Sequence, residues 1–149
     1  MQTPIQKVAI VGLGAVGGVF AGFLGAHLVE RKIQLSAIAR GQSLDVFRRD
    51  GLTWVDGADV AHHVPLTVSD NPADLGPQDL VIVAVKGPAM PEVAATVRAL
   101  MASHTTVLVA MNGVPWWFFD GLGGACDGLK LPVLDPKGGI AQCIPTSQV

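Results

Sequence analysis

Charged residues and cysteines are scarce in this sequence, and no tyrosine occurs among its 149 residues. Only 15% of the residues are charged and 50% are hydrophobic, which argues against a disordered chain. The formal net charge is −2, the isoelectric point is about 6.0, and there is no basic stripe. We therefore expect neither nucleic acid nor a membrane surface as a partner.

The two cysteines, Cys126 and Cys143, are too few for a disulfide framework, and no Cys or His cluster has zinc-ligand spacing. His62 and His63 are adjacent, so on a strand they would point to opposite faces. We interpret them as surface histidines and predict no metal site. The low cysteine content fits a reducing cytoplasm, which is the location we expect.

One hydrophobic run leaves a membrane alternative open. The 22 residues from Val8 to Val29 contain no Asp, Glu, Lys or Arg, which is long enough for a transmembrane helix. Lys7 could also be the basic start of a signal peptide. However, the run divides into a β-rich stretch, a glycine turn and a helical stretch, so we favour the start of a folded domain.

Strand and helix patterns alternate along the first three quarters of the chain. We predict buried strands at 7–11, 79–85 and 105–111, a further strand at 33–39, and helices at about 16–30, 43–49 and 88–102. In the first helix Phe20, Leu24 and Leu28 form a stripe, and Ser43 is the expected cap of the second, which Gly51 ends. One or two weaker edge strands are expected between residues 51 and 68, where Pro65 argues against a central position. The alternation predicts an α/β, Rossmann-type, doubly wound and mostly parallel sheet in a single domain, 1–149.

A glycine loop directly follows the first predicted strand. Gly12-Leu13-Gly14-Ala15-Val16-Gly17 matches G-x-G-x-x-G in the required context, after a strand and at the start of a helix. The first glycine allows the tight turn, the second the approach of a pyrophosphate, and the third close packing of helix on strand. The alternative is that the glycines serve packing only, but the context favours a dinucleotide at the helix N-terminus.

The residue that ends the second strand indicates which dinucleotide is bound. An acidic residue there accepts hydrogen bonds from the ribose 2′-hydroxyl of NAD, whereas an arginine accommodates a 2′-phosphate. Arg40 occupies this place, and Arg48 or Arg49 could assist it. The alternative is a solvated charge at a strand end; with the glycine loop, Arg40 favours NADPH.

Two further polar residues end apolar strands. Lys86 follows DLVIVAV, and Asn112 follows TTVLVAM. Ligands of doubly wound sheets bind beyond the carboxyl ends of the strands, so both residues are candidates for the crevice. Alone, Lys86 could equally be a loop charge and Asn112 part of an Asn-Gly turn without a ligand.

These segments together resemble ketopantoate reductase (2-dehydropantoate 2-reductase). The resemblance rests on GLGAVGG, IAR, DLVIVAVK, AMNGVPWWFF and LDPKGGIAQCIP, and it extends over nearly the whole chain. It implies reduction of a 2-oxo acid, 2-dehydropantoate, to pantoate with NADPH, in pantothenate and coenzyme A synthesis. By the same resemblance Gly12, Leu13, Gly14, Ala15, Val16, Gly17 and Arg40 would bind the cofactor. Lys86 and Asn112 would contact both cofactor and substrate as the catalytic residues.

The resemblance also implies a second, helical domain that supplies a catalytic lysine and a substrate-binding carboxylate. We therefore expect residues 1–149 to be the cofactor-binding half, inactive alone, and able to associate through the surface that this domain would cover. The aromatic run Trp116 to Phe119 is either part of that surface or an internal core patch. The stretch from Gly17 to Arg40 looks a few residues longer than in the family, which bears on the register of Arg40. Alternatives are another two-domain dehydrogenase, a non-catalytic NADP(H)-binding module and a small membrane protein.

Overall fold

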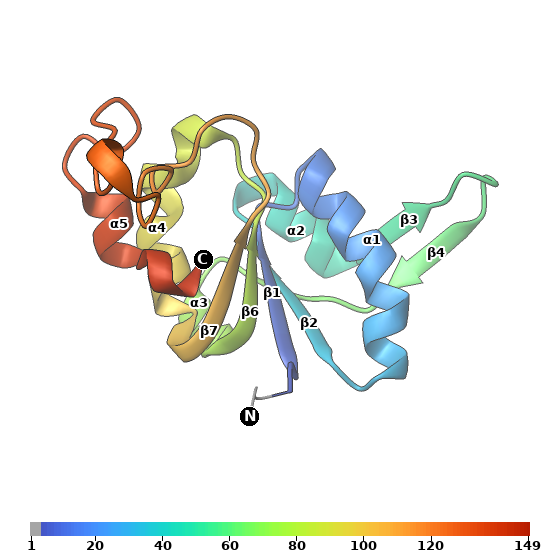
Figure 1. Cartoon of the computed structure of the whole chain (residues 1–149). Helices are drawn as coiled ribbons and strands as arrows, with labels where there is room; N and C mark the ends of the chain where they lie inside the picture. The colour runs from blue at the N-terminus through green and yellow to red at the C-terminus, as the bar shows by residue number, and fades with distance from the viewer. Residues whose placement is uncertain (1–3) are drawn as a thin grey trace.

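The computed structural model describes residues 4–149 and shows a five-stranded parallel sheet with helices on both faces (Figure 1). The strand order is β5-β2-β1-β6-β7, and every neighbouring pair is parallel. This confirms the predicted doubly wound α/β fold. The strands of the sheet are β1 (Lys7–Val11), β2 (Gln34–Ile38), β5 (Thr67–Ser69), β6 (Gln78–Val83) and β7 (Met101–Val109).

The helices divide between the two faces of the sheet. One face carries α1, against which an antiparallel hairpin of β3 and β4 packs, and the other carries α3, α4 and α5. The helices are α1 (Ala15–Glu30), α2 (Gly41–Asp50), α3 (Pro72–Leu75), α4 (Met90–Ala99) and α5 (Gly139–Cys143), with short 3-10 turns η1 (Gly87–Ala89), η2 (Gly124–Cys126) and η3 (Thr146–Gln148). The hairpin strands are β3 (Leu52–Val55) and β4 (Ala61–Val64).

The central strands are apolar because both of their faces are covered. Ala9 and Val11 belong to the core under α4, whereas Val8 and Ile10 belong to the core under α1. In β6 the residues alternate between the two cores in the same way. Continuous β-branched runs are typical of parallel strands buried on both sides, and this is why these strands were readable from the sequence.

The first helix packs closely on the glycine loop and on the β3–β4 hairpin through its small residues. A Cβ built on Gly17 would be 1.9 Å from the carbonyl oxygen of Gly12, and one on Gly22 would be 2.6 Å from the Trp54 ring. The expected stripe of Phe20, Leu24 and Leu28 is only half-buried, and the fully buried positions are Gly17, Ala21, Gly22 and Gly25. Close backbone packing, rather than a broad apolar stripe, therefore positions α1.

Three details of the predicted elements are wrong. Ser43 lies inside α2 and does not cap it, because the helix begins at Gly41 with Arg40 as its N-cap residue. The fourth helix ends at Ala99 instead of continuing to 102. Strand β7 therefore begins at Met101, and it is an edge strand on which Leu108 is 41% exposed, not a strand buried on both faces.

The segment between residues 51 and 68 forms more strands than expected. Leu52 to Val64 makes the separate hairpin, and Thr67 to Ser69 joins the sheet as its edge strand β5. Pro65 lies between β4 and β5, where a residue without an amide N–H breaks the pairing. His62 and His63 are both exposed on β4, as expected of surface histidines.

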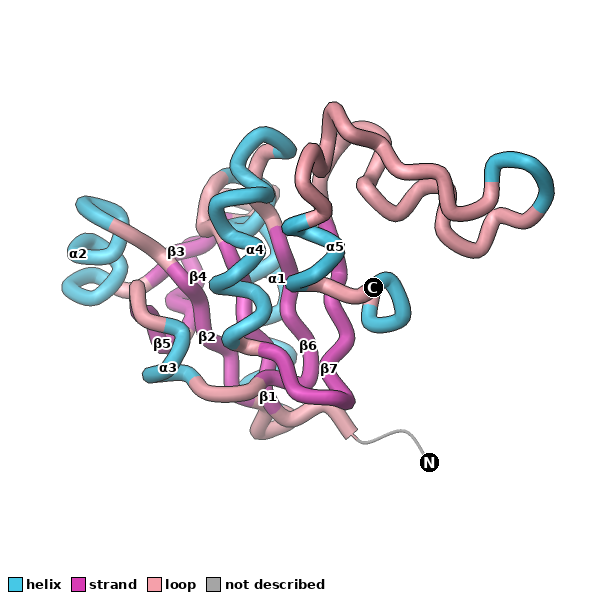
Figure 2. Tube along the Cα trace, turned by 90° about the vertical axis from the view of Figure 1, so that its left-hand side faces the viewer, coloured by secondary structure: helices cyan, strands magenta, loops and turns pink. Residues whose placement is uncertain are grey.

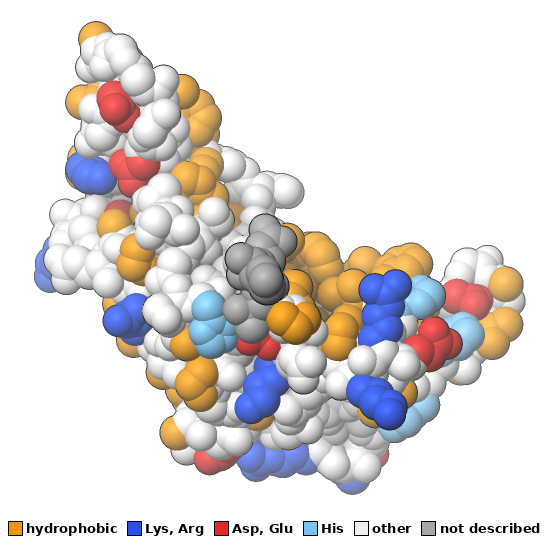
Figure 3. All heavy atoms as spheres, turned by 60° about the horizontal axis from the view of Figure 1, so that its bottom comes forward, with side chains coloured by type: hydrophobic (Ala, Val, Ile, Leu, Met, Phe, Trp, Pro, Cys, Tyr) orange, Lys and Arg blue, Asp and Glu red, His pale blue; other side chains and the backbone are white. Residues whose placement is uncertain are grey.

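A half-buried acid, Asp79, links β1, β6 and β7 near their amino ends. The Asp79 carboxylate accepts hydrogen bonds from the amides of Gln6 and Lys7, and it contacts the His104 ring at 2.9 Å. The hydrogen bond from the Gln6 amide lowers the pKa of Asp79 from its usual value, and the Lys7 amide and the His104 ring act in the same direction. On the face of the molecule that includes this edge, basic, acidic and histidine side chains are interspersed (Figure 3).

The hydrophobic run of residues 8–29 is divided between β1, the glycine loop and α1. Within residues 4–149 no helix has both the length and the apolar character needed to cross a membrane. The same part of the chain contains no group of three or more His, Cys, Asp or Glu residues placed to bind a metal ion.

The segment between β7 and α5 is mostly loop and extends away from the sheet (Figure 2). In its aromatic run Trp116 is buried, Trp117 and Phe119 are half-buried, and Phe118 is 49% exposed. The run is therefore partly core and partly surface. The Trp116 indole N–H is buried and has no hydrogen-bond partner among the described residues.

Adjacent glycines in α1 provide a test of the close packing. Gly17→Ala should lower the free energy of unfolding by about 1–3 kcal/mol or more, because its Cβ would overlap the Gly12 carbonyl. Gly18→Ala should raise it by up to about 1 kcal/mol, because a Cβ there meets nothing within 4 Å and alanine favours a helix. Denaturant unfolding measures both variants, and equal stabilities would contradict the packing described here.

Candidate functional site

In-register pairing brings the carboxyl ends of four strands into one row. Val11 of β1 lies opposite Ile38 of β2 and Val83 of β6. Val83 in turn lies opposite Val109 of β7. Lys86 and Asn112 each follow their strand at the third residue, so they leave the row at equivalent places. Neither Lys86 nor Asn112 thus follows its strand directly, as the sequence suggested, but both reach the same edge.

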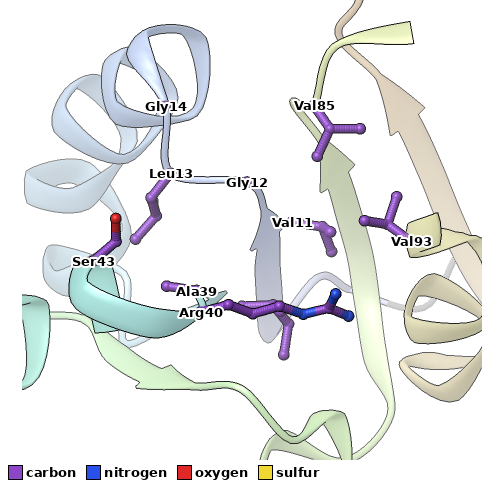
Figure 4. A pocket seen from close by; sticks show the side chains of 10 residues that line it. Val11, Gly12, Leu13, Gly14, Ala39, Arg40, Ser43, Val85 and Val93 are labelled. Carbon is purple, nitrogen blue, oxygen red and sulfur yellow. The ribbon is translucent and has the colours of Figure 1, made fainter. Parts of the chain in front are cut away.

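One pocket lies at this edge between the ends of β1 and β2 and the helix α4. We call it the Arg40 pocket; its volume is about 290 Å³ (Figure 4). The side chain of Arg40 extends from the start of α2 toward the side of the pocket that carries Val93. The Arg40 pocket is lined by Val11, Gly12, Leu13, Gly14, Ile38, Ala39, Arg40, Ser43, Val85 and Val93.

A second pocket lies on the other side of the glycine loop, between the ends of β6 and β7. We call it the Lys86 pocket; its volume is about 400 Å³. It is lined by Gly14, Ala15, Val16, Ala84, Val85, Lys86, Gly87, Ala110, Met111 and Asn112. The two pockets share Gly14 and Val85, so they form one crevice that runs over the glycine loop.

The structure brings together all but one of the residues expected at the site. Gly12, Leu13, Gly14 and Arg40 line the first pocket, and Ala15, Val16, Lys86 and Asn112 line the second. Gly17 is the exception: it lies on the buried side of α1, against the Gly12 carbonyl, and lines neither pocket. Its contribution is to hold the helix N-terminus at the crevice.

The glycine loop has the geometry that an approaching anion requires. Gly12 has a φ of +97°, a conformation that favours glycine, and turns the chain sharply after β1. A Cβ built on Gly14 would meet nothing within 4 Å, so the space above this residue is open. Backbone amides at the first turn of α1, together with the helix dipole, make this space favourable for a phosphate group.

The crevice carries positive charge without a compensating acid. Arg40 and Lys86 are the charged residues in the two linings. Among residues 4–149 neither forms an ion pair, whereas Arg48 lies 3.7 Å from Asp70 and Arg49 lies 2.6 Å from Asp50. Arg48 and Arg49 also lie outside both linings, so Arg40 is the cation available to a ligand in the first pocket.

Comparison with known proteins gives the family. The pattern described as ketopantoate reductase PanE/ApbA matches residues 8–115. The chain belongs to the ketopantoate reductase PanE/ApbA family. This is a family of NAD(P)-dependent oxidoreductases, and the match begins in β1 and includes the glycine loop, Arg40, Lys86 and Asn112.

Individual relatives extend the similarity over almost the whole chain. A 2-dehydropantoate 2-reductase of Mesorhizobium japonicum is 34% identical over 144 residues, which are 97% of this chain and 43% of that protein. A crystal structure from Ralstonia solanacearum, assigned as a ketopantoate reductase, is 44% identical with a TM-score of 0.86 over 98% of this chain and 44% of that one. A crystal structure of a 2-dehydropantoate 2-reductase from Porphyromonas gingivalis is 32% identical with a TM-score of 0.66. The match covers 75% of this chain and 40% of that one. The chain therefore spans less than half the length of these relatives.

Sequence reasoning missed several residues of this ketopantoate reductase crevice. Ser43 was interpreted as a helix cap, but it lines the Arg40 pocket. Val85 separates the two pockets, and Val93 lines the first from α4. Val85 is the residue before Lys86 and could have been found from the strand end. Val93 had no sequence signal, because its position depends on how α4 packs across β6.

Gly14 provides a direct test of the crevice. Gly14→Val should fold with a free energy of unfolding within about 0.5 kcal/mol of the parent, because position 14 is exposed, extended and has no close neighbours. The added side chain should nevertheless fill the junction of the two pockets and abolish dinucleotide binding. Denaturant unfolding and calorimetric titration measure the two properties, and tight binding by the variant would place the ligand elsewhere.

Proposed function

We propose that the crevice binds NADPH along the row of strand ends. The adenosine end would occupy the Arg40 pocket, the pyrophosphate would lie over Gly14 at the start of α1, and the nicotinamide end would occupy the Lys86 pocket. The open space above Gly14 supports this placement, as do the two pockets that meet there. This is the fit expected of the residues present, because the ligand sites of doubly wound sheets lie beyond the strand ends.

The absence of an acidic partner for Arg40 among the described residues supports NADPH over NADH as the cofactor. Its guanidinium group forms no ion pair among the described residues, and no acidic side chain lines its pocket. An acid at the end of β2 would accept hydrogen bonds from a ribose 2′-hydroxyl, but position 40 offers donors only. A planar guanidinium binds a phosphate with two parallel hydrogen bonds, so a 2′-phosphate is the complementary group.

Lys86 and Asn112 would define the reacting end of the site. When bound, NADPH supplies a hydride for the reduction of a carbonyl group. The Lys86 ammonium would attract the carboxylate or the carbonyl oxygen of a 2-oxo acid, and the Asn112 amide could orient the substrate by donating and accepting hydrogen bonds. We propose that the whole protein reduces 2-dehydropantoate to pantoate, in support of which two relatives carry that enzyme's name.

Cofactor preference tests the role of Arg40. The parent chain should bind NADPH more tightly than NADH, and Arg40→Ala should weaken NADPH by about 10- to 100-fold while leaving NADH within about threefold. Arg49→Ala is the matched control, because Arg49 is paired with Asp50 outside the pocket and its loss should change neither affinity. Calorimetric titration with both cofactors measures this preference. Equal parent affinities, or an equal loss of both on Arg40→Ala, would refute the NADPH assignment.

The activity of residues 1–149 alone gives a further test of the proposal. We expect residues 1–149 to bind NADPH but to show at most trace turnover of 2-dehydropantoate. The reduced carbonyl oxygen needs a proton, and a positioned acid typically supplies ~10²–10⁴-fold in rate. The resemblance assigns that acid to a lysine of the second, helical domain. An assay of NADPH oxidation with the purified chain checks this, and a kcat near ~1–10³ s⁻¹ would show that Lys86 and Asn112 suffice.

A further inference from the structure

Among residues 4–149 the Arg40 side chain makes one hydrogen bond, and its partner lies on α4 across the pocket. The Nη2 of Arg40 donates this hydrogen bond to the Oγ1 of Thr96 at 3.2 Å. Thr96 lies on α4, three residues after the pocket-lining Val93, and it is 9% exposed. Figure 4 shows the Arg40 side chain crossing toward that side of the pocket. Two elements that are far apart in the sequence thus meet through this hydrogen bond.

We propose that Thr96 is a positioning residue that orients the Arg40 guanidinium for the 2′-phosphate and so helps to set the preference for NADPH. This inference rests on the proposed NADPH site and deepens it. Thr96 is placed by the core, because its neighbours Ala94 and Val97 are buried at 2% and 0% exposure. A rigid helix therefore holds the hydroxyl that receives the flexible side chain.

The Thr96 hydroxyl can orient the Arg40 guanidinium without neutralising its positive charge. A guanidinium has five N–H donors, and the hydroxyl of Thr96 uses one of them, which leaves the others for a phosphate. A carboxylate at this position would orient Arg40 equally well, but it would cancel the charge that an anion needs. Arg48 and Arg49 show that alternative, because each is held by an aspartate. The neutral contact distinguishes Arg40 from both.

Orientation in advance should increase affinity by reducing the entropy lost on binding. Arginine is a long side chain with many rotamers, and an exposed one must be ordered when it binds a phosphate. The hydrogen bond to Thr96 already restricts the guanidinium to the side of the pocket. The gain in affinity is specific to ligands that bind the guanidinium. The affinity for NADH, which lacks the 2′-phosphate, should therefore not change when the Thr96 hydroxyl is removed.

The test compares three substitutions at position 96 by calorimetric titration with NADPH and NADH. Thr96→Val keeps the shape but removes the hydroxyl, and it should raise the Kd for NADPH about three- to tenfold while leaving NADH within twofold. Thr96→Ala should reproduce this loss, and it keeps the test available if valine disturbs the helix. Thr96→Ser retains the hydroxyl and should bind NADPH within twofold of the parent.

A double-mutant cycle completes the test. In an Arg40→Ala background, Thr96→Val should change neither affinity, because its effect acts through the guanidinium. The proposal is overturned if Thr96→Val weakens NADPH and NADH equally, if it tightens NADPH, if it changes neither cofactor in the parent background, or if its effect persists without Arg40. These outcomes are separate from a failure of the NADPH site itself, which would appear as equal parent affinities and no selective effect of Arg40→Ala alone.

Discussion

Parallel in-register pairing holds the carboxyl ends of β2, β1, β6 and β7 in one row, and every feature of the site follows from that row. Val11 and Val83 are the last paired residues of the two central strands, and the chain turns away from the sheet just beyond them. The glycine loop, Arg40, Lys86 and Asn112 are therefore brought to one edge although they are up to 100 residues apart. A one-residue shift in the pairing register of β6 would move Lys86 away from the crevice. It would also turn the core residues of β6 toward the opposite face of the sheet.

The second constraint is the contact between Gly17 and the Gly12 carbonyl, which brings α1 down onto the loop. It directs the N-terminus of the helix into the crevice, where Gly14 leaves open space. Arg40 and Lys86 then add positive charge on either side, while the half-buried Asp79 lies at the opposite edge of the sheet. The molecule thus separates the acid that links its strands from the two cations that line the crevice.

Much of this could be predicted from the sequence, because it depends on local patterns. The apolar runs of β1 and β6 identify strands buried on both faces, and G-x-G-x-x-G identifies the turn between strand and helix. The parts that failed depend on tertiary packing. Nothing local shows that β7 is an edge strand with Leu108 half exposed, or that glycines and Ala21 form the buried face of α1. The Arg40 to Thr96 contact is of the same kind, because it joins residues 56 positions apart.

A crystal structure of the chain with NADP⁺ bound tests the central claim most directly. The account predicts the 2′-phosphate within hydrogen-bond distance of the Arg40 guanidinium, with the Thr96 contact kept. It also predicts the pyrophosphate over Gly14 at the start of α1 and the nicotinamide ring between Lys86 and Asn112. A cofactor bound in the reverse direction, with its adenosine end at Lys86, would contradict the assignment of the two pockets. A cofactor bound away from the row of strand ends would contradict the account as a whole.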